Sequence, residues 1–240
     1  MCKEKNSIVY VYRMTHDYGL NPCCFNESFE PTPELLTLGG CEINIRTWIN
    51  NNMWLEKGYD VYVMAVAAKE SDDNGRFDPD GRTFIPEPEE IGYQGLIYAA
   101  KISDVMSRTD YLKSDIGKGR LDVKQYLEPN GCGNEPHGYG NETESKDEPV
   151  LLSNEFVYFG GVPYEIPKDR VVQYFNKFRT ERDHRGRSYG DPSQPATFTA
   201  RDELVKLAEE VINENKENPV VNYPYHPWGR EVLWNLKGCN

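Results

Sequence analysis

The sequence predicts an α+β protein with a mixed, mostly antiparallel sheet, and three observations support this fold class. Segments rich in β-branched and aromatic residues, which are typical of strands, dominate the first two thirds of the 240 residues. The last third contains one long amphipathic pattern that is typical of a helix. The chain also has 20 Gly and 16 Pro residues, which indicates many turns between these elements. Runs of strands followed by helix favour α+β over a parallel α/β arrangement.

Four segments are expected to form the sheet. The first, SIVYVYRM, opens the chain, and the last, VLLSNEFVYFGG, carries an aromatic pair and ends at two glycines. A long acidic, turn-rich insert at 71–94 separates the middle two segments. The expected strands lie within residues 7–14, 59–70, 95–105 and 150–161.

The segment at 41–58 fits two interpretations. Spacing of Ile45, Trp48, Ile49 and Met53 matches one face of a helix, whereas Ile43, Ile45 and Ile49 would also match one face of a strand. The sequence alone leaves both open.

Two helix starts carry capping signals. Ser107 begins a Ser-x-x-Asp pattern that predicts a short helix. Thr199 and Asp202 form a second such pattern, and the apolar stripe that follows predicts a helix after Thr199. Its members are Leu204, Leu207, Ala208, Val211 and Ile212.

We expect a single domain over residues 1–240. Its core would lie within 7–167, interrupted by a polar excursion at 114–149, and residues 168–240 would add a basic loop and the C-terminal helix.

Charge and hydropathy exclude several classes. The 27 basic and 39 acidic residues give a net charge of −12, which opposes binding of duplex DNA through bulk electrostatics. The longest apolar run, VYVMAVAA, is far shorter than the roughly 20 residues that span a bilayer. The start of the sequence lacks the apolar segment of a secretory signal, so we expect a cytoplasmic protein that does not contact membranes.

Metal ligands and catalytic motifs are not apparent. The six Cys and four His residues show no paired spacing of the kind that structural zinc sites use, and we expect no metal and no cofactor. Cys132 and His137 share a glycine-rich loop, but a thiol and a base become a catalytic pair only when they are close in space. Whether the protein is an enzyme is left open.

The segment THDYGLNPCCF, residues 15–25, carries the best candidate binding groups because it directly follows an expected strand. Asp17 can accept hydrogen bonds from amino groups such as those on a nucleobase edge, and Gly19 permits a positive φ. Asn21 precedes a proline, and Phe25 offers a face for stacking. The alternative interpretation is a turn that only ends the strand.

This segment, together with LTLGGCEINIRTW, GLIYAAKISDVMSRTDY and VLLSNEFVYFGGVPYEIP, resembles the second of the nucleotide modification associated domain families. The four blocks keep the family's order over about residues 8 to 167. Three family features are missing: a proline is replaced by Leu20, the Lys-Pro after the cysteine is absent, and Gly-Asp-Trp is replaced by GYDVYV. The matching positions are Asp17, Gly19, Asn21, Pro22, Phe25, Thr37, Cys41, Ile45, Arg46, Tyr98, Ala99, Ser153, Phe156, Tyr158, Phe159 and Gly160.

The resemblance implies a PUA-like β-barrel with peripheral helices, which holds a modified base in a pocket, and a role in phage or bacterial systems that modify DNA. It places Asp17, Gly19, Asn21, Phe25, Cys41, Arg46 and Tyr98 at a ligand site. Asp17 would read an exocyclic amine, and Arg46 would pair with a phosphate or a carbonyl oxygen across one cavity.

A basic segment, RTERDHRGRSYG, adds candidate phosphate ligands, since guanidinium groups bind phosphate in a bidentate manner. Its candidates are Arg182, Arg185 and Arg187; a solvated charged loop is the alternative. The leading hypothesis is a protein that binds a nucleotide or a modified nucleobase. The alternatives are an enzyme acting on such compounds, with Asp17 as base or Cys41 as nucleophile, and a protein that sequesters a signalling nucleotide or blocks a host protein.

Overall fold

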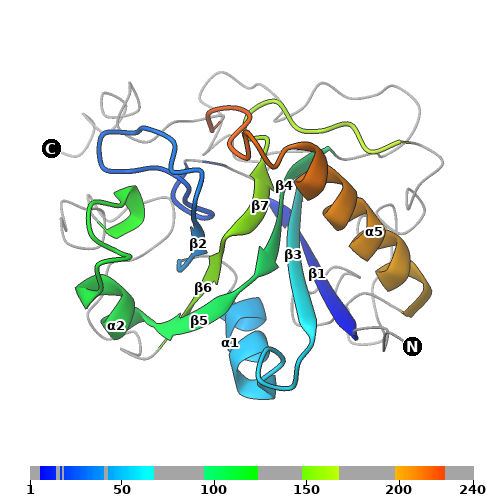
Figure 1. Ribbon diagram of the computed structural model, residues 1–240, viewed down its shortest axis with the longest axis horizontal. Helices are drawn as coiled ribbons and strands as arrows, with labels where there is room; N and C mark the ends of the chain where they lie inside the picture. The colour runs from blue at the N-terminus through cyan, green and yellow to red at the C-terminus, as the bar shows by residue number, and fades with distance from the viewer. Residues whose placement is uncertain are drawn as a thin grey trace, which may run out of the picture.

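The computed structural model describes residues 6–14, 17, 19–40, 43–67, 95–123, 148–167 and 198–224. These residues form an α+β fold with two sheets and several helices, which confirms the predicted fold class (Figure 1). The two sheets do not close into a barrel within this part of the chain.

The larger sheet has four strands in the order β1-β3-β4-β7. Strands β1 (Ser7–Met14) and β3 (Asp60–Ala67) are parallel to each other. The other neighbours, β4 (Leu96–Ile102) and β7 (Glu155–Tyr158), are antiparallel to β3 and to each other. The sheet is therefore mixed, as the sequence predicts.

The smaller sheet has three antiparallel strands in the order β2-β6-β5. They are β2 (Leu36–Leu38), β5 (Asp104–Ser107) and β6 (Pro149–Ser153). The segment at 150–161, expected to be one strand, thus contributes to β6 in this sheet and to β7 in the other.

One bent ribbon joins the two sheets. Only Ser103 separates β4 from β5, and only Asn154 separates β6 from β7. Because β4 pairs with β7 and β5 pairs with β6, the same two stretches of chain run antiparallel through both sheets. Ser153 lies at the bend, where its Oγ is 2.7 Å from the carbonyl oxygen of Lys101 and 2.9 Å from that of Glu155.

The four-stranded sheet buries both faces. Helix α5 (Phe198–Glu214) covers one face with the predicted apolar stripe, which packs against Val9, Val11, Met64 and other outward side chains of β1, β3 and β4. Helix α1 (Ile43–Asn52) contributes Ile45 and Ile49 to the core on the opposite face, together with the smaller sheet. Buried side chains therefore alternate strictly along β1 and β3.

Local helix signals are only partly matched by the observed bounds. The ambiguous segment at 41–58 forms α1, and Met53, the last member of the helical stripe, has φ 52° and is 52% exposed just beyond the end of the helix. Helix α2 (Arg108–Lys113) is capped by Ser107, whose Oγ accepts from the Asp110 N–H at 3.0 Å, as predicted. Helix α5 begins at Phe198, before the Thr199 cap that the sequence predicts.

None of the helices in the described part of the chain combines the length and the apolar character that crossing a membrane requires.

We predict that Ser153→Ala lowers the free energy of unfolding by about 1–3 kcal/mol, because it leaves two carbonyl oxygens at the buried bend without this hydroxyl. Ser103→Ala is the matched control: Ser103 is exposed, and its Oγ donates to one carbonyl oxygen among the described residues, that of Leu152, at 3.1 Å. Urea unfolding of both variants checks this. Equal losses for the two serines would contradict the assigned role of Ser153.

Candidate functional site

A row of tyrosines crosses the inner face of the four-stranded sheet, the face opposite α5. The strand register pairs Tyr12 with Ala65, Ala65 with Tyr98, and Tyr98 with Tyr158. All four side chains are buried and belong to the same core cluster. Three phenol groups thus lie side by side inside the protein.

Ala65 explains how the first two rings meet. Its small side chain leaves space between β1 and β4, so that the rings of Tyr12 and Tyr98 approach edge to face, with centroids 6.1 Å apart. The Tyr98 hydroxyl donates to the Tyr12 hydroxyl at 3.1 Å. The polar tips of two core tyrosines therefore satisfy each other within an otherwise apolar face.

Asp17 completes this row from the loop that follows β1. Its side chain is 0% exposed; Oδ1 accepts from the Gly19 N–H at 3.0 Å, and Oδ2 accepts from the Tyr158 hydroxyl. Burial raises the pKa of Asp17 to about 6, although both hydrogen bonds oppose this shift. Asp17 can therefore gain or lose a proton close to neutral pH.

The loop around Asp17 has the conformation that the sequence indicates. Gly19 has φ +74°, which confirms the expected positive φ, and a Cβ at this position would lie 2.7 Å from Pro224 Cγ. The peptide bond between Asn21 and Pro22 is cis. The loop can follow this path only because residue 19 has no side chain.

Asn21 connects this loop to the chain that leads into α1. Its Oδ1 accepts from the N–H groups of Gly39, at 3.3 Å, and Gly40, at 2.7 Å. Its Nδ2 is buried and has no hydrogen-bond partner among the described residues. A buried amide donor without a partner costs stability and is therefore a candidate for binding a ligand.

Arg46 is placed by α1 and is 0% exposed. Its guanidinium donates to the carbonyl oxygens of Pro149 and, at 3.3 Å, Gly40, and lies 3.3 Å from Glu148 Oε2. Glu148 also pairs with Arg108. These contacts of Arg46 are all with the protein itself, so the expected contact with a phosphate or a carbonyl oxygen of a ligand stays a prediction.

The expected pair of Asp17 and Arg46 facing each other across one cavity is not what these contacts describe. Asp17 binds Tyr158 and the Gly19 backbone, whereas Arg46 binds the start of β6 and the turn before α1. Both residues are buried, but each has its own set of partners. A candidate site in this structure therefore centres on Asp17, without Arg46.

A second buried polar cluster lies under β2. Asp122 accepts from Thr37 Oγ1 at 2.8 Å and from the Tyr111 hydroxyl at 2.9 Å, and its Oδ1 lies 3.7 Å from Arg120 Nε. Arg120 also donates to the Cys23 carbonyl oxygen at 2.6 Å. This carboxylate has a cationic neighbour, in contrast to Asp17, so the cluster is a structural ion-pair network, although Arg120 Nε has no hydrogen-bond partner among the described residues.

The same environment makes Cys23 unreactive. Burial and the nearby Asp122 raise the pKa of its thiol to about 12, so the nucleophilic thiolate is not formed near neutral pH. The described residues contain no group of three or more His, Cys, Asp or Glu side chains arranged to hold a metal ion.

Phe25 does not offer a free face for stacking on a base. Its ring is 0% exposed and stacks on Phe29, with centroids 4.9 Å apart, and on Tyr223, at 5.8 Å. It also contacts Tyr158 edge to face. Phe25 therefore packs the loop against the tyrosine row, and the expectation that it stacks on a ligand is corrected.

Residues 219–224, which we call the strap, cover this region after α5 ends. The strap runs parallel to β7: the Tyr158 N–H donates to the Pro219 carbonyl at 2.7 Å, and the Val221 N–H donates to the Tyr158 carbonyl at 2.9 Å. The Gly161 N–H donates to the Tyr223 carbonyl at 2.8 Å. The strap thus pairs the free edge of β7 and lies over Gly19 and Phe25.

Four of the sequence-predicted ligands, Cys41, Arg182, Arg185 and Arg187, lie outside the described residues. Of the others, Asp17, Gly19, Asn21 and Phe25 belong to one loop, and Tyr98 lies in the tyrosine row. Tyr12 was missed. Its alternation with Tyr10 in β1 places both on one face, but alternation does not tell which buried hydroxyls meet.

Comparison with known proteins gives no match to any family model, curated protein or solved structure. The functional conclusions below therefore depend on the residues themselves.

We predict that Asp17 destabilises the fold as pH rises. Its folded pKa of about 6 is above the unfolded value of 3.8, so the folded state binds the extra proton, and this contribution is lost between about pH 4 and pH 6. Two pKa units correspond to roughly 3 kcal/mol. The stability of the wild type relative to Asp17→Asn should fall by up to about this amount over that range.

Urea unfolding at several pH values measures this difference. Asp115→Asn, which removes an exposed carboxylate, is the control for a change of one charge. If the free energy of unfolding of the wild type, relative to that of Asp17→Asn, rises with pH, the prediction is wrong and the fold stabilises Asp17 as the anion.

We predict that Tyr223→Ala loosens the strap, because Tyr223 stacks on both Phe25 and Phe29. Hydrogen exchange should accelerate about tenfold or more at the N–H groups of Val221 and Gly161, which join the strap to the sheet edge. Asn222→Ala, at an exposed neighbouring position, should leave these rates unchanged. Acceleration spread evenly over β1 and β3 would mean that Tyr223 supports the whole fold rather than the strap.

Proposed function

We propose that the protein binds a nucleobase or nucleotide at the polar end of the tyrosine row, with Asp17 as the main recognition group. The observation that carries this proposal is that the Asp17 carboxyl is fully buried while its described partners, the Gly19 N–H and the Tyr158 hydroxyl, are both neutral. Proteins normally keep carboxylates exposed to solvent, and a carboxylate that is buried is normally paired with a cation. A group retained at such a cost is typical of a functional site.

The chemistry of these groups favours a flat heterocycle with donors and acceptors on one edge. A carboxylate accepts from an exocyclic amine, as Asp and Glu do from cytosine, and a side-chain amide can add a further donor. Asn21 Nδ2 is such a donor. Enzymes and binding proteins that recognise an isolated base use the same combination of edge hydrogen bonds within an enclosing pocket.

A small ligand also agrees with the charge of the chain. A net charge of −12 repels duplex DNA but does not prevent binding of a free base or nucleoside, whose recognition requires only local groups. We extend the proposal to modified bases and to a role in phage or bacterial DNA modification because the sequence blocks resemble the second nucleotide modification associated domain family.

Within the α+β class, we propose that the two sheets form a PUA-like arrangement. The bent ribbon of β4–β5 and β6–β7 supports it, because two strands that pass from one sheet into the next are a step toward a barrel. Asp17 binds Tyr158 at the end of β7 away from this bend, so the proposed base site lies at the far end of the ribbon.

A catalytic role is the second candidate, and the pKa of Asp17 favours it. A carboxyl with a pKa of about 6 is suited to general acid–base chemistry at neutral pH, and the Tyr158 hydroxyl is within hydrogen-bond reach. In that case Asp17 would move a proton to or from a bound base or nucleotide.

A panel of nucleobases, nucleosides, nucleotides and modified nucleosides tests the binding proposal by thermal shift. We expect at least one compound with an exocyclic amine to raise the melting temperature by several degrees in the wild type and in Asp115→Asn. Asp17→Asn should lose this shift, because it replaces the acceptor on Oδ2 by a donor or removes its charge. No shift with any member of the panel, or the same shift in Asp17→Asn, would refute the proposal.

Mass spectrometry of the same mixtures distinguishes binding from catalysis. A product that forms with the wild type and not with Asp17→Asn would identify the second candidate as the function. An unchanged ligand after prolonged incubation supports binding alone.

A further inference from the structure

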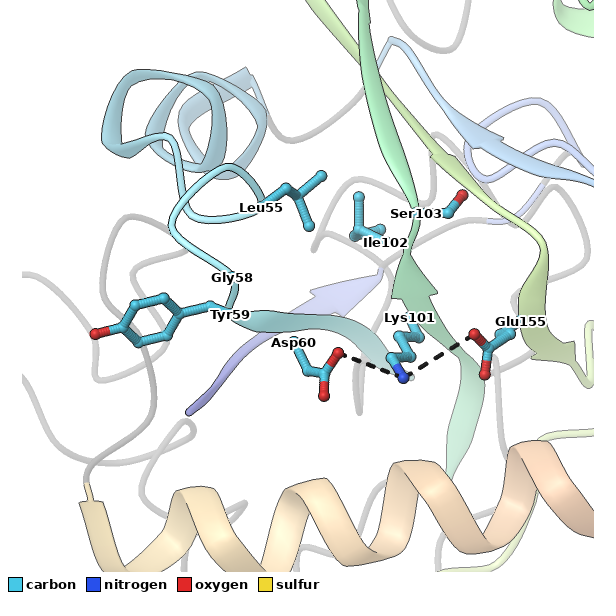
Figure 2. Close-up of a pocket in the computed structure, with 8 residues that line it drawn as sticks. All are labelled: Leu55, Gly58, Tyr59, Asp60, Lys101, Ile102, Ser103 and Glu155. Carbon is cyan, nitrogen blue, oxygen red and sulfur yellow. Dashed lines mark ion pairs between the residues drawn. The ribbon is translucent and has the colours of Figure 1, made fainter. Parts of the chain in front are cut away.

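A separate pocket of about 290 Å³ opens at the opposite end of the four-stranded sheet. The start of β3, the end of β4 and the start of β7 form its floor, and the turn after α1 forms one wall (Figure 2). Its position on three strands gives its side chains a rigid support.

The floor carries charges of both signs. The Lys101 ammonium lies 3.4 Å from Asp60 Oδ1 and 4.0 Å from Glu155 Oε1, and Figure 2 shows it between the two carboxylates. Lys101 is 27% exposed and Glu155 is 61% exposed. The long contact to Glu155 is a surface pair that contributes little stability, so a ligand can replace it at small cost.

Tyr62 and Asp60 hold the Lys101 ammonium in place. It lies 5.9 Å from the centre of the Tyr62 ring and forms an ion pair with Asp60. An ammonium has three donors, so this position leaves donor capacity toward the open side of the pocket. The cation is therefore fixed while remaining available to an anionic group.

We propose that this pocket binds the zwitterionic head of a free α-amino acid. The ligand carboxylate would pair with Lys101, and the ligand ammonium would pair with Glu155. A plain anion such as phosphate would meet two carboxylates, and a plain cation would meet the Lys101 ammonium. Only a ligand that carries both charges a few ångströms apart complements all three groups.

Apolar residues in the wall of the pocket favour an amino acid with an apolar side chain. Leu55 and Ile102 point toward one another beside the charged floor in Figure 2. A volume of about 290 Å³ is at the small end of ligand sites, which suits a single amino acid rather than a peptide or nucleotide. Leucine is the simplest probe with this combination of groups.

Isothermal titration calorimetry with three related compounds tests the assignment. We expect L-leucine to bind, and both N-acetyl-L-leucine, which lacks the ammonium, and L-leucinamide, which lacks the carboxylate, to bind at least tenfold more weakly. Failure of L-leucine to bind at millimolar concentration, or equal binding of either blocked compound, would overturn the proposal.

Two variants assign the contacts. Lys101→Met keeps the aliphatic stem over Tyr62, and Glu155→Gln keeps the size of an exposed side chain, so each should weaken L-leucine binding at least tenfold. Lys206→Met is the matched control, since it removes an exposed lysine that pairs with Glu203 on α5. If Lys101→Met does not fold, Glu155→Gln alone decides. Unchanged affinity in Glu155→Gln would contradict the proposed ammonium contact.

Discussion

The bent ribbon formed by β4–β5 and β6–β7 is the constraint on which the rest of the structure depends. Because its two strands pair in both sheets, the position of one sheet fixes the other. The ribbon also carries Tyr98 and Tyr158 as opposite partners, so the register that joins the sheets is the register that builds the tyrosine row. A shift of one residue would turn both phenols to the face that α5 covers.

The buried charges divide into two kinds. Arg46 with Glu148, and Arg120 with Asp122, pair opposite charges and fasten loops to the strands beneath them. Asp17 has only neutral described partners and a raised pKa. Stability alone explains the first two arrangements. It does not explain Asp17, because an apolar or amide residue at this position would avoid the cost of burying an ionisable group.

The features that could be predicted from the sequence are those that local chemistry determines. The observed strand β1 and the Ser107 cap agree with the sequence prediction, because alternation and capping depend on residues only a few positions apart. The bend was not predicted, because it results from pairing between segments far apart in the chain. Phe25 was assigned to a ligand because nothing near it in the sequence reveals that Tyr223 covers its ring. Asp17 was correctly placed in a loop that directly follows a strand, but its partner Tyr158 comes from β7, far away in the chain.

Strand β4 places the two proposed sites so that neither blocks the other. Tyr98 lies on the face that packs against α1, whereas Lys101, three residues later, lies over Tyr62 on the face that α5 covers. An odd separation along a strand puts side chains on opposite faces. The pocket also includes Leu55 and Ile102 from the cluster on the Tyr98 face, so the two ligands are separated because they would lie at opposite ends of one sheet. The paired strands β4 and β7 carry residues of both sites, so they connect the two sites directly.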